Sequence, residues 1–259
     1  MTLLEIRGLA KRFGGVTALD GVDLAVNRDE ILGLIGPNGA GKTTLFNCVS
    51  GFSPPSAGEI RFGESRLELA GRGPHEVARL GVARTFQNIR LFPLMTVLEN
   101  VLVGRYLRTR AGVAAALWRP GWARDEEEHS RLKAEEWLEF VGLEARAGAA
   151  ARELPLGDQR RLEIARALAQ EPMLLLLDEP AAGMNPSETE ALMELIGRIR
   201  TQGVTLFLIE HDMRVVMGIS DRVAVLDHGI LIAEGRPAEI QRNQGVIEAY
   251  LGRADGAVA

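Results

Sequence analysis

The distribution of apolar residues along the chain predicts an α/β core. Predominantly apolar stretches at residues 31–35, 173–177 and 204–209 are typical of strands buried on both faces of a sheet. Two segments have the composition and spacing of helices: residues 157–168, before the second run, and residues 187–200, between the second and third runs. Buried strands alternating with helices in this way are typical of α/β proteins.

The N-terminal part has a two-residue period instead. Apolar side chains occupy alternate positions in residues 3–7 and again in residues 19–26, with a turn expected at residues 13–15. Residues 59–62 read as a further short strand. We therefore expect an antiparallel β layer ahead of the buried strand at residues 31–35.

The middle of the chain changes character and predicts an α-helical subdomain at residues 91–154. Residues 98–106 are expected to form one helix, and residues 125–140 an amphipathic one with acidic residues in its first turn. The rest of the chain, residues 1–90 and 155–259, is expected to form the α/β core with its antiparallel layer.

The C-terminal part predicts small elements that complete the core. Residues 213–219 are expected to be helical, and residues 222–226 and 230–233 to form a hairpin. One final helix is expected at residues 237–250, followed by a frayed tail.

Composition narrows the class of protein. Of the 259 residues 46% are hydrophobic and 25% charged, which is ordinary for a globular protein with a substantial core. A net charge of −5 without a basic run argues against nucleic acid as the main partner. The single cysteine, Cys48, makes no intramolecular disulfide and is expected to be a buried core residue in a reducing compartment. We find no signal-peptide pattern and no apolar run near the roughly 20 residues of a membrane span, so any membrane part is expected on another chain.

A glycine-rich stretch after the first apolar run fits the phosphate-binding P-loop, a glycine and four residues followed by Gly-Lys-Thr. Glycines let the backbone turn its N–H groups toward a phosphate, and the start of the next helix adds partial positive charge. We expect Lys42 to reach the terminal phosphates and the Thr43 hydroxyl to ligate Mg²⁺. The residues expected to bind nucleotide here are Gly36, Pro37, Asn38, Gly39, Ala40, Gly41, Lys42, Thr43 and Thr44.

Further polar side chains downstream complete a site for attack of water on a phosphoanhydride. Asp178 ends an apolar strand and can hold Mg²⁺, while Glu179 beside it can polarise the attacking water. Gln87 can sense the γ-phosphate and the metal, and His211 can bond the γ-phosphate. We therefore expect ATP and Mg²⁺ as cofactors, with catalytic residues Lys42, Gln87, Glu179 and His211 and metal ligands Thr43, Gln87 and Asp178.

Together these motifs resemble the nucleotide-binding subunits of ABC transporters over nearly the whole chain. The resemblance implies a RecA-like P-loop NTPase core, with Phe13 stacking on adenine. It is carried by the Walker A loop at 36–44, the Q-loop at Gln87, the signature position at 154–160, the Walker B strand at 174–179, the D-loop position at 182–185 and the switch histidine His211. GTPases, kinases and helicases also have P-loops but lack the signature element ahead of Walker B.

More narrowly, the chain resembles the ATP-binding subunits of branched-chain amino-acid importers. The similarity lies in residues 84–87, the insert at 104–140, and residues 160–166, 178–186, 209–213 and 216–222. It implies transmembrane permease subunits and a second ATP-binding subunit, identical or different, as partners. It also implies an indirect periplasmic or extracellular substrate-binding protein, no nucleic acid, and a peripheral place on the cytoplasmic face of the inner (plasma) membrane.

The family resemblance implies a head-to-tail dimer in which the signature of one subunit caps the ATP of the other. Leu156, Gly157 and Asp158 would then contact nucleotide across the interface. This chain departs from the usual Leu-Ser-Gly-Gly-Gln, because Pro155 replaces the serine, Leu156 a glycine and Asp158 the glutamine. The hypothesis that follows is an ATP-bound dimer weaker than the consensus by ~1–3 kcal/mol, the range for a lost hydrogen bond to a charged group.

Three alternatives stay open on sequence. The cargo can be different, such as urea or amides for uptake or lipopolysaccharide for export. A soluble ABC ATPase of translation or repair would usually carry two cassettes or a long coiled coil, and the chain shows neither. A non-hydrolysing regulatory binder would explain the unusual signature, but the intact Glu179 and His211 argue against it.

Overall fold

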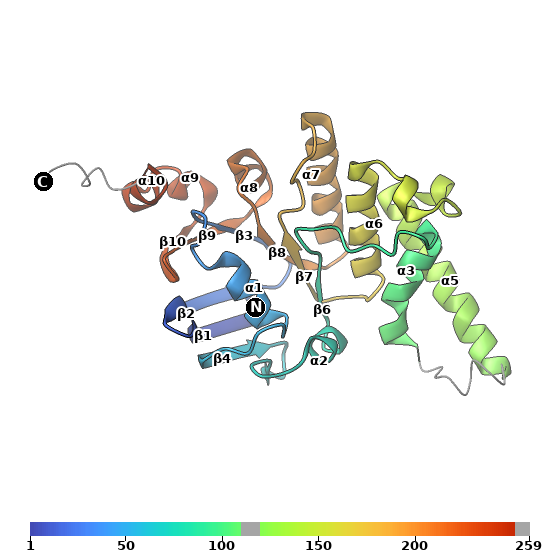
Figure 1. Cartoon of the computed structure of the whole chain (residues 1–259), viewed down its shortest axis with the longest axis horizontal. Coiled ribbons are helices and arrows are strands. Elements are labelled where there is room, and N and C mark those ends of the chain that lie inside the picture. The colour runs from blue at the N-terminus through green and yellow to red at the C-terminus, as the bar shows by residue number, and fades with distance from the viewer. Residues whose placement is uncertain (110–119, 252–259) are drawn as a thin grey trace, which may run out of the picture.

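A computed structural model describes residues 1–109 and 120–251, which form two β-sheets, covering helices and a helical segment at one end (Figure 1). The first sheet is antiparallel, in the order β2-β1-β4-β5. Its strands are β1 (Thr2–Phe13), β2 (Val16–Asn27), β4 (Ala57–Phe62) and β5 (Leu67–Glu68). The predicted antiparallel layer is confirmed, and its first strands are longer than the alternating segments alone indicate.

The second sheet has the order β10-β9-β3-β8-β7-β6. Neighbouring strands are parallel except for β10, which runs antiparallel to β9. Its strands are β3 (Ile31–Ile35), β6 (Val82–Arg84), β7 (Leu174–Asp178), β8 (Thr205–Ile209), β9 (Arg222–Asp227) and β10 (Ile230–Gly235). Because parallel strands end at the same edge, the residues that follow β3, β6, β7 and β8 meet there.

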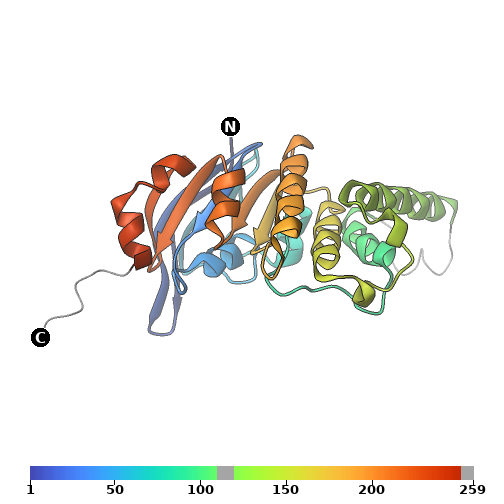
Figure 2. The same ribbon diagram turned by 90° about the horizontal axis from the view of Figure 1, so that it is seen from above.

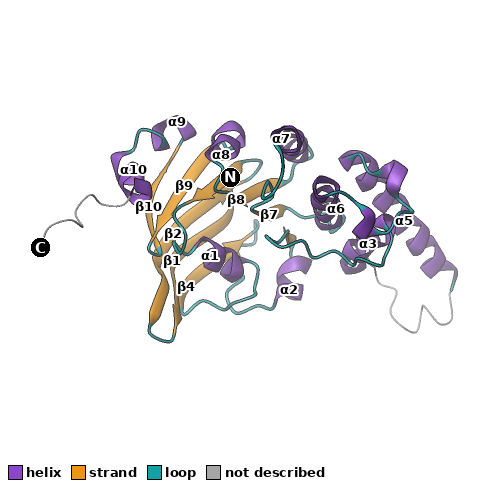
Figure 3. Ribbon diagram, turned by 45° about the horizontal axis from the view of Figure 1, so that its top comes forward, coloured by secondary structure: helices purple, strands orange, loops and turns teal. Residues whose placement is uncertain are grey.

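Alternate side chains of the central strands enter two separate apolar cores. In β7, Leu175 and Leu177 belong to one core, whereas Leu174 and Leu176 belong to the other. Burial on both faces explains why the strands read as continuous apolar runs. Figure 3 shows α7 and α8 on one side of the strands and α1 on the other. The helices that cover the sheet are α1 (Lys42–Val49), α2 (Pro74–Arg79), α6 (Leu156–Leu168), α7 (Pro186–Thr201) and α8 (Met213–Ile219).

The helical segment packs beside α6, at the end of the molecule away from β10 (Figure 2). It contains α3 (Val97–Arg105), α5 (Gly121–Val141) and the 3₁₀ turns η1 (Tyr106–Arg108), η2 (Glu144–Arg146) and η3 (Ala151–Glu153). The expected acidic first turn is wrong, because α5 begins at Gly121, after Pro120, and residues 125–128 lie further along it. Part of the 104–140 insert, residues 110–119, lies outside the described residues. The division into core and helical subdomain stays a prediction.

The C-terminal part differs from the single helix expected at residues 237–250. Two helices form instead, α9 (Pro237–Ile240) and α10 (Gln244–Leu251). Asn243 separates them, and its side-chain oxygen accepts a hydrogen bond from the N–H of Val246 at 3.3 Å, as an N-cap residue does. The tail expected to fray, residues 252–259, lies outside the described residues. Within the described ranges, no helix is long and apolar enough to cross a bilayer.

Candidate active site

The glycine-rich loop connects the end of β3 to the start of α1, as its spacing predicts. Gly36 has φ +151° and Gly41 has φ +102°. A Cβ atom at Gly36 would lie 2.0 Å from the Leu226 carbonyl oxygen, and one at Gly41 would lie 2.4 Å from the Ala18 carbonyl oxygen. Both positions therefore require glycine, because the loop backbone approaches neighbouring backbone too closely for a side chain.

Lys42 lies over this loop and faces two of its carbonyl groups. Its Nζ donates to Gly36 O at 2.7 Å and to Pro37 O at 3.0 Å. Burial lowers the pKa of Lys42, while the nearby carboxylates of Glu179 and Asp178 act in the opposite direction. These carbonyl bonds hold the ammonium group at the loop, where an anionic ligand can compete for it.

A cavity of about 300 Å³ is lined by the P-loop together with two of the predicted catalytic residues. Gln87 and Glu179 face it from other elements, and the remaining lining residues are Ala18 and residues 38–44. A larger cavity of about 550 Å³ lies beside the same loop, between residues 37–40, the β9–β10 turn and α10. Lys42, Gln87 and Glu179 line the smaller cavity and are not among the residues that line the larger one.

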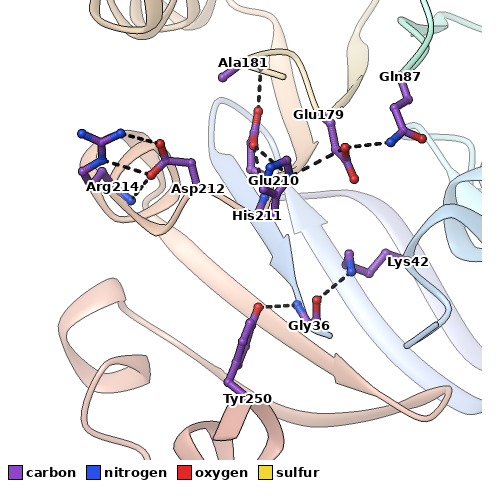
Figure 4. A network of polar contacts seen from close by, with 10 residues as sticks. All are labelled: Gly36, Lys42, Gln87, Glu179, Ala181, Glu210, His211, Asp212, Arg214 and Tyr250. Atoms are coloured by element: carbon purple, nitrogen blue, oxygen red, sulfur yellow. Dashed lines mark hydrogen bonds and ion pairs between the residues drawn. The ribbon is translucent and has the colours of Figure 1, made fainter. Parts of the chain in front are cut away.

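Glu179 follows β7 in an unusual backbone conformation. Its φ is +48°, in the left-handed region that non-glycine residues rarely adopt, and its N–H donates to the Ile209 carbonyl at 2.9 Å. Its Oε2 accepts a hydrogen bond from Gln87 Nε2 at 2.9 Å, and His211 Nδ1 lies 3.6 Å from the same oxygen (Figure 4). The structure thus brings together Gln87, Glu179 and His211, which come from distant parts of the sequence.

Asp178, the last residue of β7, forms a buried ion pair that the sequence did not indicate. Arg84 Nη2 donates to Asp178 Oδ2 at 2.8 Å, and the two side chains are 5% and 4% exposed. The other guanidinium nitrogen, Nη1, donates to Asn47 Oδ1 at 2.8 Å and to Ser50 Oγ at 2.9 Å. Burial lowers the pKa of Arg84, whereas its bond to Asp178 raises it.

The oxygen donors near the P-loop fit a hard cation such as Mg²⁺. Asp178 has a second oxygen, Oδ1, beyond the one that accepts from Arg84. Gln87 uses its amide nitrogen toward Glu179, which leaves the amide oxygen as a donor for a metal. With the Thr43 hydroxyl at the start of α1, these groups offer the oxygen ligands that Mg²⁺ prefers.

The remaining predicted nucleotide contacts lie away from this cavity. Phe13, at the end of β1, is 51% exposed, and Lys11 Nζ lies 4.8 Å from its ring centroid. The cavity lining includes neither Phe13 nor residues 156–158. Pro155 is the N-cap residue of α6 without a side-chain cap bond, and Asp158 accepts a hydrogen bond from Arg161. The structure of one chain therefore leaves the roles of these residues as predictions.

Sequence reasoning assigned no role to Glu210 or Tyr250. Glu210 is 1% exposed and accepts backbone hydrogen bonds from Ala181 and His211, and burial raises its pKa against the effect of those bonds. Tyr250 on α10 accepts a hydrogen bond from the Gly36 N–H at 2.8 Å (Figure 4). Adjacency to His211 was the only sequence signal for Glu210, and none pointed to Tyr250.

Comparisons with known proteins agree with this geometry. A family model described as ABC transporter matches residues 19–182, and one described as branched-chain amino acid ATP-binding cassette transporter matches residues 231–256. The high-affinity branched-chain amino acid transport ATP-binding protein LivG of Salmonella typhimurium is 49% identical over 253 residues, covering 97% of this chain and 98% of LivG.

Two solved structures extend the comparison to the fold. The ADP conformation of MJ1267, an ATP-binding cassette of an ABC transporter, has a TM-score of 0.85 and 34% identity, covering 97% of this chain and 99% of that one. The dimeric structure of MJ0796, a bacterial ABC transporter cassette, has a TM-score of 0.76 and 26% identity, covering 91% and 99%. The chain therefore belongs to the ABC transporter family, as an ATP-binding cassette.

Proposed function

We propose that this protein hydrolyses ATP to ADP and phosphate and thereby drives a membrane importer for branched-chain amino acids. The observation that carries the proposal is the meeting of Gln87, Glu179 and His211 at one carboxylate oxygen, with Glu179 and Gln87 lining the P-loop cavity. The cargo rests on the 49% identity to LivG and on the family match at residues 231–256.

Phosphate binding begins at the P-loop. The loop N–H groups and the N-terminus of α1 stabilise the anion, since backbone donors and the helix dipole favour negative charge there. Lys42 exchanges its bonds to the Gly36 and Pro37 carbonyls for bonds to the terminal phosphates. Mg²⁺, held by Thr43, Gln87 and Asp178, would supply charge neutralisation at the phosphates.

Hydrolysis then depends on Glu179 as the general base. Glu179 orients a water molecule for in-line attack and accepts its proton, and a hydrogen bond from Gln87 holds the carboxylate oxygen in place. His211, whose side chain is exposed, is then free to bond the γ-phosphate. Positioning and charge stabilisation provide most of the rate acceleration in such reactions.

The working unit is proposed to be a head-to-tail dimer, which the similarity to the dimeric MJ0796 structure supports. Leu156, Gly157 and Asp158 at the start of α6 would face the ATP of the partner subunit. Asp158 brings negative charge toward that polyanion, and Arg161 partly offsets it. Pro155 offers neither a hydroxyl nor an N–H group, so we infer weaker ATP-driven association than in a consensus cassette.

The partners are proposed to be transmembrane permease subunits, a second ATP-binding subunit and, indirectly, a substrate-binding protein. Phe92 and Leu94 are 46% and 77% exposed and follow Gln87 in sequence, which suits contact with a permease near the site. The protein would then be peripherally associated with the cytoplasmic face of the inner (plasma) membrane. Phe13 is proposed to stack on the adenine ring.

Two measurements test the proposed function. Phosphate release should be near background in Glu179→Gln, while binding of a fluorescent ATP analogue stays within about threefold of wild type, because the P-loop is unchanged. Wild-type turnover in this variant would show that Glu179 is not the general base.

The cargo is tested by co-purifying the chain with its permease and measuring uptake of radiolabelled leucine in reconstituted vesicles. Uptake of urea, or export of lipid, in place of leucine uptake would show that the cargo is not a branched-chain amino acid.

A further inference from the structure

Glu210 is a buried carboxylate at the point where two loops of the site meet. It directly follows β8, immediately before His211, and is 1% exposed. Burial of a charged group is unfavourable unless hydrogen bonds compensate for it. The hydrogen bonds made by this side chain therefore indicate why the chain keeps a carboxylate here.

Each oxygen of Glu210 accepts from a different loop. Oε1 accepts from the Ala181 N–H at 2.8 Å, in the loop that follows Glu179. Oε2 accepts from the N–H of His211 at 3.1 Å, in the loop that follows β8 (Figure 4). The same side chain thus joins the backbone next to the proposed base to the backbone of the proposed γ-phosphate ligand.

This connection bears on the strained conformation of Glu179. A non-glycine residue at φ +48° persists only where its surroundings hold it. The Glu179 N–H is held by the Ile209 carbonyl at 2.9 Å, and the Ala181 N–H, two residues on, is held by Glu210. The strained residue is therefore held to the end of β8 by its own N–H and again by the N–H two residues later.

We propose that Glu210 is a positioning residue that sets Glu179 and His211 at their mutual distance of 3.6 Å. The inference rests on the proposed ATP hydrolysis, because it assigns Glu210 a role in placing the base and the histidine. Residues 182–185, which resemble the D-loop, directly follow Ala181 and are therefore connected to His211 through this one carboxylate. Glu210 itself does not line the P-loop cavity.

The geometry requires two acceptor oxygens, which distinguishes glutamate from its amide. Glutamine offers one acceptor oxygen and one NH₂ donor group. In Glu210→Gln, either the Ala181 N–H or the His211 N–H faces an NH₂ group and loses its bond. Aspartate keeps both acceptors on a side chain shorter by one methylene group. Glu210→Gln is therefore the informative variant, and Glu210→Asp is the conservative one.

The experiment measures ATP turnover as a function of ATP concentration for the full chain and its variants. For Glu210→Gln we expect kcat to fall about tenfold or more while KM stays within about threefold, because the P-loop still holds the phosphates. Glu210→Asp should recover part of kcat. The matched control is Glu76→Gln, in which another carboxylate bonded to a backbone N–H, that of Gly73 at 2.9 Å, is changed outside the site; it should retain wild-type kcat.

Other results distinguish a failure of the Glu210 inference from a failure of the proposed function. A Glu210→Gln variant that keeps wild-type kcat, or whose kcat falls only in step with its folded fraction by circular dichroism, overturns the positioning role. If Glu210→Gln does not fold, Glu210→Asp is measured instead: a kcat below wild type with KM within about threefold supports the positioning role, and a wild-type kcat overturns it. Glu179→Gln is measured in parallel: unchanged turnover there overturns the proposed function, whereas a dead Glu179→Gln with an active Glu210→Gln overturns only this inference.

Discussion

The buried ion pair between Arg84 and Asp178 provides a direct test of how the site is held together. Asp178 ends β7, and its carboxylate is neutralised by Arg84 from the neighbouring strand β6 at 2.8 Å. We predict that Arg84→Met strongly destabilises the fold. Methionine fills much of the same apolar space, but it leaves an ionised carboxylate buried without its cation.

The structure allows the magnitude to be worked out. Removing one partner of a buried ion pair costs about 3–5 kcal/mol, because the remaining charge is desolvated without compensation. Arg84→Met also removes the hydrogen bonds to Asn47 and Ser50, which adds to the loss. We expect the free energy of unfolding to fall by at least about 3–5 kcal/mol, a large share of the ~5–15 kcal/mol typical of a folded domain.

Urea denaturation followed by circular dichroism at neutral pH measures this change. Adding Asp178→Asn to Arg84→Met removes the uncompensated buried charge and should recover about 0.5–3 kcal/mol, the range of coupling between contacting residues. Arg61→Met is the control, because Arg61 and Glu59 also form a close pair at 2.6 Å but are 35% and 51% exposed. Because solvent screens the charges, such an exposed ion pair contributes only about 0–1 kcal/mol to the free energy of unfolding. Equal losses in Arg84→Met and Arg61→Met, or no recovery in the double variant, would refute the reasoning.

Three further predictions concern other parts of the chain. Pro155→Ser should strengthen ATP-induced dimerisation by ~1–3 kcal/mol, because it restores a hydroxyl group at the start of α6. Size-exclusion chromatography at graded ATP concentrations measures the dimerisation. Unchanged association would contradict the prediction. Tyr250→Phe removes the acceptor of the Gly36 N–H and should lower the free energy of unfolding by about 0.5–1.5 kcal/mol in urea titrations, whereas an equally stable variant would show that this bond contributes nothing. Burial raises the pKa of the Cys48 thiol to about 11 from 9.0, so its contribution to stability should be complete below about pH 9 and decline as the pH rises toward 11. Iodoacetamide should accordingly label Cys48 slowly in the native protein and rapidly in denaturant, and fast native labelling would count against burial.

Much of the fold could be predicted because its signals are local. The apolar run of residues 31–35 followed by a glycine-rich loop was sufficient to place β3, the P-loop and α1 in order. The run of residues 173–177 likewise located β7, since a strand buried on both faces has no polar positions. Errors arose where a cap decided the boundary, as at Pro120 before α5 and at Asn243 between α9 and α10.

Residues that line the P-loop cavity could be named from the sequence, but the contacts among the side chains around it could not. Lys42, Gln87 and Glu179 stand in recognisable local patterns, and the structure places all three around one cavity. Their partners follow from strand order, which no local pattern encodes. Arg84 reaches Asp178 because β6 lies beside β7, and Glu210 reaches Ala181 because β8 lies beside β7.

By itself, the sequence determined the elements of this protein and the residue types available for phosphate chemistry, because hydrophobic period and glycine spacing act over a few neighbouring residues. Only the tertiary structure decided that Glu210 bonds two loops and that Tyr250 contacts the P-loop from α10. The contacts of Glu210 with Ala181 and of Tyr250 with Gly36 join residues far apart in the chain. They exist because the strands pair in one order and their ends converge on one edge of the sheet, which is a property of the whole packed core.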